Sequence, residues 1–174
     1  MFTCFATLFS RIKALPPLEK QKFLKFFLLF LRIVDMISTG LQKLDKSLSG
    51  GIPNAVIVDI FGKNGTGKTQ LLLQLAINSI KNGGNVLYFD TTGGFRPERI
   101  LDIQKTSESQ LDFLNHITVS RLTNTSEQIN SIKNIDNNFS LILIDNVTDL
   151  FSYEYQKDES VFEKNSLFMK YMHD

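Results

Sequence analysis

Short apolar runs alternate with longer stretches of helical period from residue 36 onward. A short run rich in Val, Ile and Phe predicts a buried strand, whereas apolar residues three and four positions apart predict a helix. The predicted strands cover residues 55–61, 85–90, 116–121 and 140–145. The predicted helices cover residues 41–48, 68–81, 97–105, 126–135 and 160–172. This alternation predicts an α/β domain with a mainly parallel sheet.

Two details of this pattern carry further expectations. Ser38 and Thr39 precede the first helix, where small hydroxyl residues are typical caps. Residues 151–160, FSYEYQKDES, mix aromatic and charged side chains. We expect this stretch to be a solvated loop, with a partner contact as the alternative.

The first 35 residues break the alternation and predict a separate apolar, helical extension before a domain at 36–174. Residues 23–34, FLKFFLLFLRIV, are apolar on nearly every helical face but include Lys25 and Arg32. A membrane-spanning helix needs roughly 20 apolar residues, so this run is too short. We expect it to pack on the main domain or on another chain. Membrane association and a spurious upstream extension of the reading frame are the alternatives. A signal peptide is also conceivable, but no small-residue cleavage site follows the apolar run.

Composition narrows the class of protein. A length of 174 residues suits one domain, and 43% hydrophobic residues are enough for a core. The formal net charge of +1 gives no overall attraction to nucleic acid. The single cysteine, Cys4, excludes an internal disulfide framework and fits a reducing, cytoplasmic location. His116 and His173 have no Cys or carboxylate at ligand spacing, so no metal site of that kind is expected.

A glycine-rich turn joins the predicted strand 55–61 to the predicted helix 68–81. Its residues fit the spacing G-x-x-x-x-G-K-[ST], which is typical of a phosphate-binding loop in a P-loop NTPase. Glycines let successive N–H groups point inward at phosphate oxygens, next to the positive end of the helix. Lys68 supplies a charge to the phosphates, and the Thr69 hydroxyl is placed to ligate Mg²⁺. The predicted nucleotide-binding residues are Gly62, Lys63, Asn64, Gly65, Thr66, Gly67, Lys68, Thr69 and Gln70, with ATP and Mg²⁺ as the ligands.

Polar residues follow three predicted strands, at the edge where an α/β sheet binds ligands. Asp145 follows an apolar run, as does the aspartate that holds the Mg²⁺ water shell in P-loop ATPases. Asp90 either ties down the loop after its strand or reaches the site through water. Arg121 ends the third strand and could be a simple surface charge.

Five stretches together resemble the RecA/RadA recombinase ATPases, specifically the archaeal RadA and RadB type. The stretches are ISTGLQKLDKSLSGGIP, FGKNGTGKTQL, VLYFDTTGGFRPERI, ITVSRLTNTSEQ and LILIDNVTDLFSYEYQ, and the resemblance covers residues 36–174. It implies a RecA-like three-layer sandwich and an ATP-binding protein of DNA repair and homologous recombination. In FRPERI, the most specific motif, the resemblance implies that Arg99 packs against the adenine, which suits a planar guanidinium.

The first departure from the family is one residue. The family reads Asp-Thr-Glu-Gly where this chain reads Asp90, Thr91, Thr92 and Gly93. Thr92 therefore replaces the glutamate expected to orient and deprotonate the attacking water, and a threonine hydroxyl is no base near neutral pH. General-base assistance is worth roughly 10² to 10⁴ in rate. We expect ATP binding with slow or absent hydrolysis, so ATPase activity is in doubt.

The second departure concerns the sheet. The family order is 3-2-4-5-1, and the sequence ends after the helix that follows strand 4, before strand 5 and the DNA-binding loops. Either strand 1 pairs with strand 4 in an incomplete sheet of about four strands, or two unpaired edges invite another chain. The family's polymerisation motif, Phe-x-x-Ala, does not occur in residues 1–35.

Two functions from different classes follow. The first is a RadA/RadB-like ATP-binding protein, with DNA binding implied by resemblance alone. The second is a non-catalytic module that binds nucleotide structurally and associates with a recombinase-like subunit or with itself. A circadian-clock or signalling type of RecA-superfamily ATPase is a third option, and FRPERI argues against it.

Overall fold

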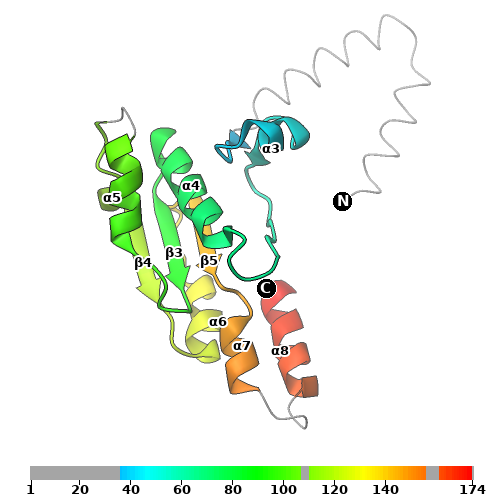
Figure 1. The fold of residues 1–174 in the computed structure, drawn as a ribbon. Helices are drawn as coiled ribbons and strands as arrows, with labels where there is room; N and C mark the ends of the chain where they lie inside the picture. Colours follow the sequence, from blue (N-terminus) through cyan, green and yellow to red (C-terminus); the bar gives the residue numbers. More distant parts are fainter. Residues whose placement is uncertain (1–35, 107–109, 156–160, 174) are drawn as a thin grey trace, which may run out of the picture.

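The structure is a computed structural model that describes residues 36–106, 110–155 and 161–173 (Figure 1). The predictions about the extension at residues 1–35 therefore lie outside the described residues. Among the described helices, none combines the length and the apolar character needed to cross a membrane.

Three parallel strands form the main sheet, in the order β4-β3-β5. Strand β3 (Val86–Asp90) lies between β4 (Ile117–Arg121) and β5 (Leu141–Asp145). The register pairs Asp90 with both Arg121 and Asp145, so the three strands end at the same level. All five residues of β3 are buried, which explains its continuous apolar sequence.

Helices cover both faces of this sheet and give three layers. Helices α4 (Lys68–Lys81) and α5 (Pro97–Thr106), with the 3-10 helix η1 (Phe113–His116), share one buried cluster with β3 and β5. Residues of α6 (Thr125–Lys133) and α7 (Asp149–Glu154) pack against Leu87 and Phe89 on the other face. The predicted α/β class with a parallel sheet is confirmed.

Helix α4 carries the glycine turn into the core. It has the predicted bounds, and its inward face includes Leu73, Ile77 and Ile80, each at most 2% exposed. It ends where Gly83 adopts a left-handed φ of 85° and donates its N–H to the carbonyl of Ile80.

A small antiparallel ladder precedes this domain core. Strand β1 (Met36–Ile37) pairs with β2 (Ile52–Pro53), and α3 (Gln42–Ser47) lies between them. The expected caps Ser38 and Thr39 were a wrong assignment, because the N-cap of α3 is Leu41 and no side chain caps the helix. Both hydroxyls instead donate to the Asp45 carboxylate, at 2.6 Å each, and lower the pKa of Asp45.

The predicted buried strand at residues 55–61 is wrong. These residues form a turn and an irregular stretch, drawn without an arrow in Figure 1. Ile57 and Phe61 are 86% and 89% exposed. The physical reason is that no described strand lies beside this segment to pair with its backbone, and β-branched residues alone do not make a strand. Strand β5 is consequently an edge of the described sheet. The alternative in which residues 55–61 pair with residues 140–145 does not occur.

The expected solvated loop at residues 151–160 is also wrong over its first part. Residues up to Glu154 belong to α7, in which Leu150 and Phe151 are buried. Helix α8 (Val161–His173) packs against α7 through aromatic contacts of Phe151 with Phe168 and Tyr171, at centroid distances of 5.2 and 5.4 Å. An aromatic residue among charges is here an anchor for a helix. Residues 156–160 lie outside the described part.

Candidate nucleotide-binding site

The carboxyl edge of the sheet and the start of α4 meet at one place. Asp145 ends β5 on the face that α4 covers, and Thr69 lies in the first turn of α4. The Thr69 hydroxyl donates to Asp145 Oδ2 at 2.7 Å. Two residues 76 positions apart, each selected as a Mg²⁺ ligand from the sequence, are therefore in direct contact.

The glycine turn at residues 62–67 is exposed and closes on itself. Gly65 and Gly67 have φ of 78° and 91°, a region that residues with a Cβ rarely adopt. The Lys68 ammonium spans the turn and donates to the carbonyls of Gly62 at 2.9 Å and Lys63 at 3.0 Å. Gly67 begins α4 with no side-chain cap. The start of this helix is thus open to an anion, because first-turn amides have no partner within the helix.

The oxygen atoms beside Thr69 suit Mg²⁺ rather than a transition metal. Magnesium takes oxygen ligands and is held by one or two carboxylates together with phosphate oxygens. A hydroxyl and a carboxylate supply that kind of donor here. Within the described ranges, no group of three or more His, Cys, Asp or Glu could hold a metal ion, so the Thr69–Asp145 pair is the candidate.

A tyrosine in β3 completes the surroundings of Asp145. The Tyr88 hydroxyl donates to Asp145 Oδ2 at 2.8 Å, the same oxygen that Thr69 contacts. Burial, followed by the negative charge of Asp145, raises the pKa of Tyr88 well above its usual value. Tyr88 therefore stays a protonated donor at any physiological pH.

Asp90 ties down the loop that follows β3. Its Oδ1 accepts the N–H groups of Thr92 at 3.1 Å, Gly93 at 2.7 Å and Gly94 at 3.1 Å, and its Oδ2 accepts that of Phe95 at 3.1 Å. Burial raises the pKa of Asp90, but these backbone hydrogen bonds and the charge of Arg121 outweigh burial and lower it. Of the two roles considered from the sequence, the geometry favours the loop anchor.

Arg121 is more than a surface charge. Its guanidinium donates to the carbonyl of Asp90 at 2.9 Å and lies 3.6 Å from the Asp90 carboxylate. The side chain of Arg121 is half exposed, whereas that of Asp90 is 6% exposed, so the pair joins a buried carboxylate to a partly solvated guanidinium.

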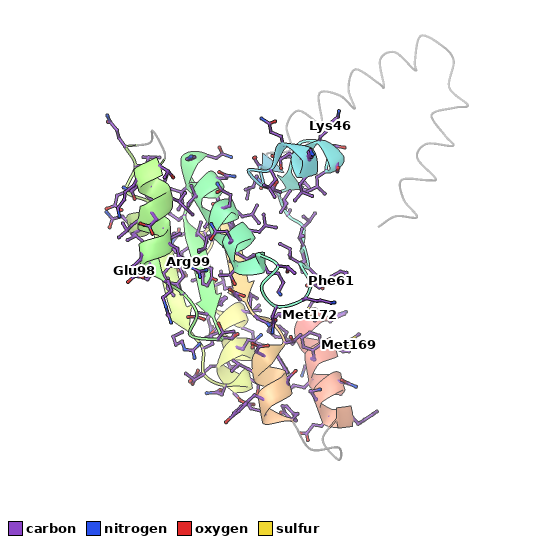
Figure 2. All side chains as sticks on the ribbon, in the orientation of Figure 1. Lys46, Phe61, Glu98, Arg99, Met169 and Met172 are labelled. Carbon is purple, nitrogen blue, oxygen red and sulfur yellow. The ribbon has the colours of Figure 1, made fainter. Side chains whose placement is uncertain are left out.

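Thr92 and Arg99 lie on the exposed side of this edge. The Thr92 hydroxyl donates to Asp90 Oδ1 at 3.2 Å and accepts the N–H of Gly94 at 3.2 Å, so it acts within its own loop. Arg99 is exposed in the first turn of α5 (Figure 2). It is close enough for its charge to oppose the rise in the pKa of Tyr88.

Residues 32–174 match the family model of Rad51. This match covers well over half of the chain. The chain belongs to the Rad51 family. It is 37% identical to the DNA repair and recombination protein RadA of Cenarchaeum symbiosum (strain A) over a 134-residue alignment, which covers 70% of this chain and 34% of RadA. The Rad51-family chain thus spans about a third of the length of that curated relative, and the resemblance seen in the sequence is confirmed.

Sequence reasoning missed two residues at this edge of the sheet, Tyr88 and Thr91. Thr91 joins the ends of β3 and β5, because its hydroxyl exchanges hydrogen bonds with the carbonyl (2.7 Å) and N–H (2.8 Å) of Asn146. The peptide between Asp145 and Asn146 is cis. One signal could have revealed Tyr88. It is the single residue with a hydroxyl in an otherwise apolar run, two positions before a strand-ending aspartate.

Proposed function

We propose that this Rad51-family chain binds ATP with Mg²⁺ at the glycine turn and the start of α4, and that it serves in DNA repair and recombination. The contact between Thr69 and Asp145 is the observation that carries the nucleotide part. It joins a hydroxyl and a carboxylate beside an uncapped helix start that two left-handed glycines precede. The recombination part, including DNA as a partner, rests on family membership.

Each residue of the proposed site has a defined task. The amides of residues 62–69 bind phosphate oxygens, and the Lys68 ammonium moves from the turn carbonyls to the phosphates. Thr69 and Asp145 hold Mg²⁺, which supplies charge neutralisation for the phosphates when bound. Arg99 stacks its guanidinium on the adenine from the start of α5.

Hydrolysis is slow or absent in this proposal, because no carboxylate at residues 90–95 is free to act as the base. Thr92 occupies the position of the family glutamate, and its hydroxyl bonds to Asp90. Asp90 does not replace the glutamate, since its carboxylate accepts four backbone N–H groups and its pKa is lowered. A strong acid surrounded by donors is a poor general base.

Thermal unfolding with and without Mg-ATP tests the binding site. Ligand at 100 times its dissociation constant should stabilise the chain by roughly 2.7 kcal/mol. A Lys68→Ala variant should lose most of this gain. A Lys46→Ala variant removes an exposed lysine on α3, away from the turn (Figure 2), and should keep it. Equal stabilisation of wild type and Lys68→Ala would refute the assigned site.

Single-turnover hydrolysis with saturating Mg-ATP tests the second part. Wild type and Thr92→Ala should be equally slow, whereas Thr92→Glu should accelerate hydrolysis by about 10²-fold or more, as a positioned base does. Ordinary DNA-stimulated turnover in wild type, with Thr92→Ala silent, would reject the proposed loss of catalysis.

The second candidate is a partner module that keeps nucleotide as a structural ligand. The exposed apolar residues Val56, Ile57 and Phe61 favour it, because they lie beside the turn and cover no core. Size-exclusion chromatography with light scattering, with and without residues 1–35, separates the two functions. A stable complex with a recombinase-like subunit or a homo-oligomer supports the module, and a monomer at all concentrations argues against it.

A further inference from the structure

Tyr88 is a polar residue in β3, the most buried of the described strands. It is 1% exposed, in the middle of β3. A buried hydroxyl costs free energy unless it is hydrogen-bonded, so the position of its partner is informative. That partner is a charged group at the functional edge, Asp145 Oδ2, at 2.8 Å.

The geometry around the carboxylate is asymmetric. Thr69 and Tyr88 both donate to Oδ2, and within the described part of the chain no donor reaches Oδ1. Two donors on one oxygen restrict the rotation of a carboxylate, and they leave the lone pairs of Oδ1 available to a ligand. Thr69 has its own task at the proposed metal, whereas Tyr88 comes from the core and cannot swing out of it.

The ring of Tyr88 adds a second connection. It packs on Phe95 with a centroid distance of 5.0 Å and an interplanar angle of 59°. Phe95 is the last residue of the loop that Asp90 holds, the loop that contains Thr92. One side chain thus touches both the aspartate that ends β5 and the loop that ends β3.

We infer that Tyr88 is a positioning residue for magnesium: its hydroxyl sets the orientation of the Asp145 carboxylate toward the metal of the bound nucleotide. This inference rests on the proposed function. Groups that orient a metal ligand typically change metal affinity by about 10- to 100-fold when they are removed. Tyr88 affects the nucleotide only through the metal, so metal-free nucleotide binding should not depend on it.

The test is the Mg²⁺ dependence of binding of a fluorescent adenine nucleotide to the full chain. Tyr88→Phe keeps the ring and removes the hydroxyl, and it should raise the Mg²⁺ concentration at half-saturation by about tenfold. Affinity in EDTA should stay within about twofold of wild type. Tyr153→Phe is the matched control, since Tyr153 is 75% exposed on α7, and it should leave both quantities unchanged.

A double-mutant cycle separates this role from a general structural one. In an Asp145→Asn background, Tyr88→Phe should cause no further change in Mg²⁺ dependence, because the hydroxyl acts through the carboxylate. Independent, additive effects would overturn the inference, as would a Tyr88→Phe titration identical to that of Tyr153→Phe.

If Tyr88→Phe does not fold, a measurement on a chain that keeps Tyr88 still tests the inference. With 3-fluorotyrosine in place of tyrosine, ¹⁹F NMR resolves the tyrosines, and Phe substitutions at Tyr153, Tyr155 and Tyr171 assign Tyr88 by difference. The Tyr88 signal should shift when Mg²⁺ is added to the nucleotide complex, and a fixed signal would contradict the inference. Absence of Mg²⁺-dependent nucleotide binding in wild type would instead refute the proposed function itself.

Discussion

Two apolar runs of similar composition have opposite fates in this chain. Residues 141–144, LILI, form β5 and pair with β3, and Leu143 is 5% exposed. Residues 56–61, VIVDIF, form no strand, and Ile57 is 86% exposed. The difference lies in the neighbours, since β5 has β3 beside it and the other run has no described strand. Strand formation here is a property of the pairing, with residue preference as a minor term.

Hydrogen exchange should give the largest contrast between the two runs. Amides bonded between β3 and β5 exchange only when the whole domain opens, whereas those of residues 56–61 exchange locally. A stability of about 5 kcal/mol or more makes the rates differ by on the order of 10³-fold or more. Exchange read out by NMR or mass spectrometry checks this, and comparable protection would mean that residues 56–61 are paired in solution.

A matched pair of substitutions tests the same contrast through side chains. Ile77→Ala empties a position that is fully buried in α4 and should cost about 2–5 kcal/mol of unfolding free energy. Ile57→Ala removes the same atoms from an exposed position and should stay within about 0.5 kcal/mol. Urea unfolding followed by circular dichroism measures both. Similar losses for the two would show that Ile57 is packed against a core.

The loop after β3 is held by the Asp90 carboxylate, whereas the hydrogen bonds of the glycine turn involve no carboxylate. The stability of this loop should therefore depend on Asp90. Asp90→Asn removes the charge that four backbone N–H groups contact and should cost about 1–3 kcal/mol. Because the folded pKa of Asp90 is lowered, its stabilisation is complete above the unfolded pKa and is lost as pH falls through the folded pKa.

Melting temperature measured from about pH 7 down to 3 checks this sign. The difference between wild type and Asp90→Asn should shrink as Asp90 becomes protonated. Asp102→Asn is the control, because Asp102 is exposed on α5, pairs there with exposed Lys105 and should change stability little. A difference that grows on acidification would contradict the role of the charged form.

The starts of two helices give the smallest expected effect. Helix α6 begins with Asn124, whose side chain accepts the N–H of Glu127 at 2.8 Å, whereas α4 begins at Gly67 with no such cap. Asn124→Ala should therefore cost about 1 kcal/mol. Ser47→Ala, at the C-terminal end of α3, is the control and should be nearly neutral. The same urea unfolding measures both variants. No loss in Asn124→Ala would mean that this cap contributes nothing.

Much of the fold could be predicted because periodicity reports burial. The bounds of α4 agree with the sequence prediction, and those of β3, β5 and α5 agree within one residue. Residues 55–61 could not be judged in this way, since a pattern gives the preference of a segment and not the presence of a neighbour. Helix α7 was missed because six residues show too little period, and its assignment depends on Phe151 meeting α8.

The site was predictable to the extent that its residues follow motifs. The spacing selected Thr69, and the end of an apolar run selected Asp145, and the structure brings these two together. Hydrogen bonds that depend on how the elements pack, such as that of Tyr88 to Asp145 and that of Ser38 to Asp45, have no sequence signature of their own. They arise only when the strands and loops are set side by side.

If the glycine turn binds nucleotide as proposed, its affinity is coupled to the conformation of residues 55–61, which have no described strand beside them. A turn preceded by a segment without a strand partner can adopt more than one conformation, and nucleotide would select those in which the turn is formed. If about one molecule in ten is competent at a given moment, the measured dissociation constant is about tenfold larger than the intrinsic one. Any polypeptide that paired with this segment would tighten nucleotide affinity without touching the nucleotide.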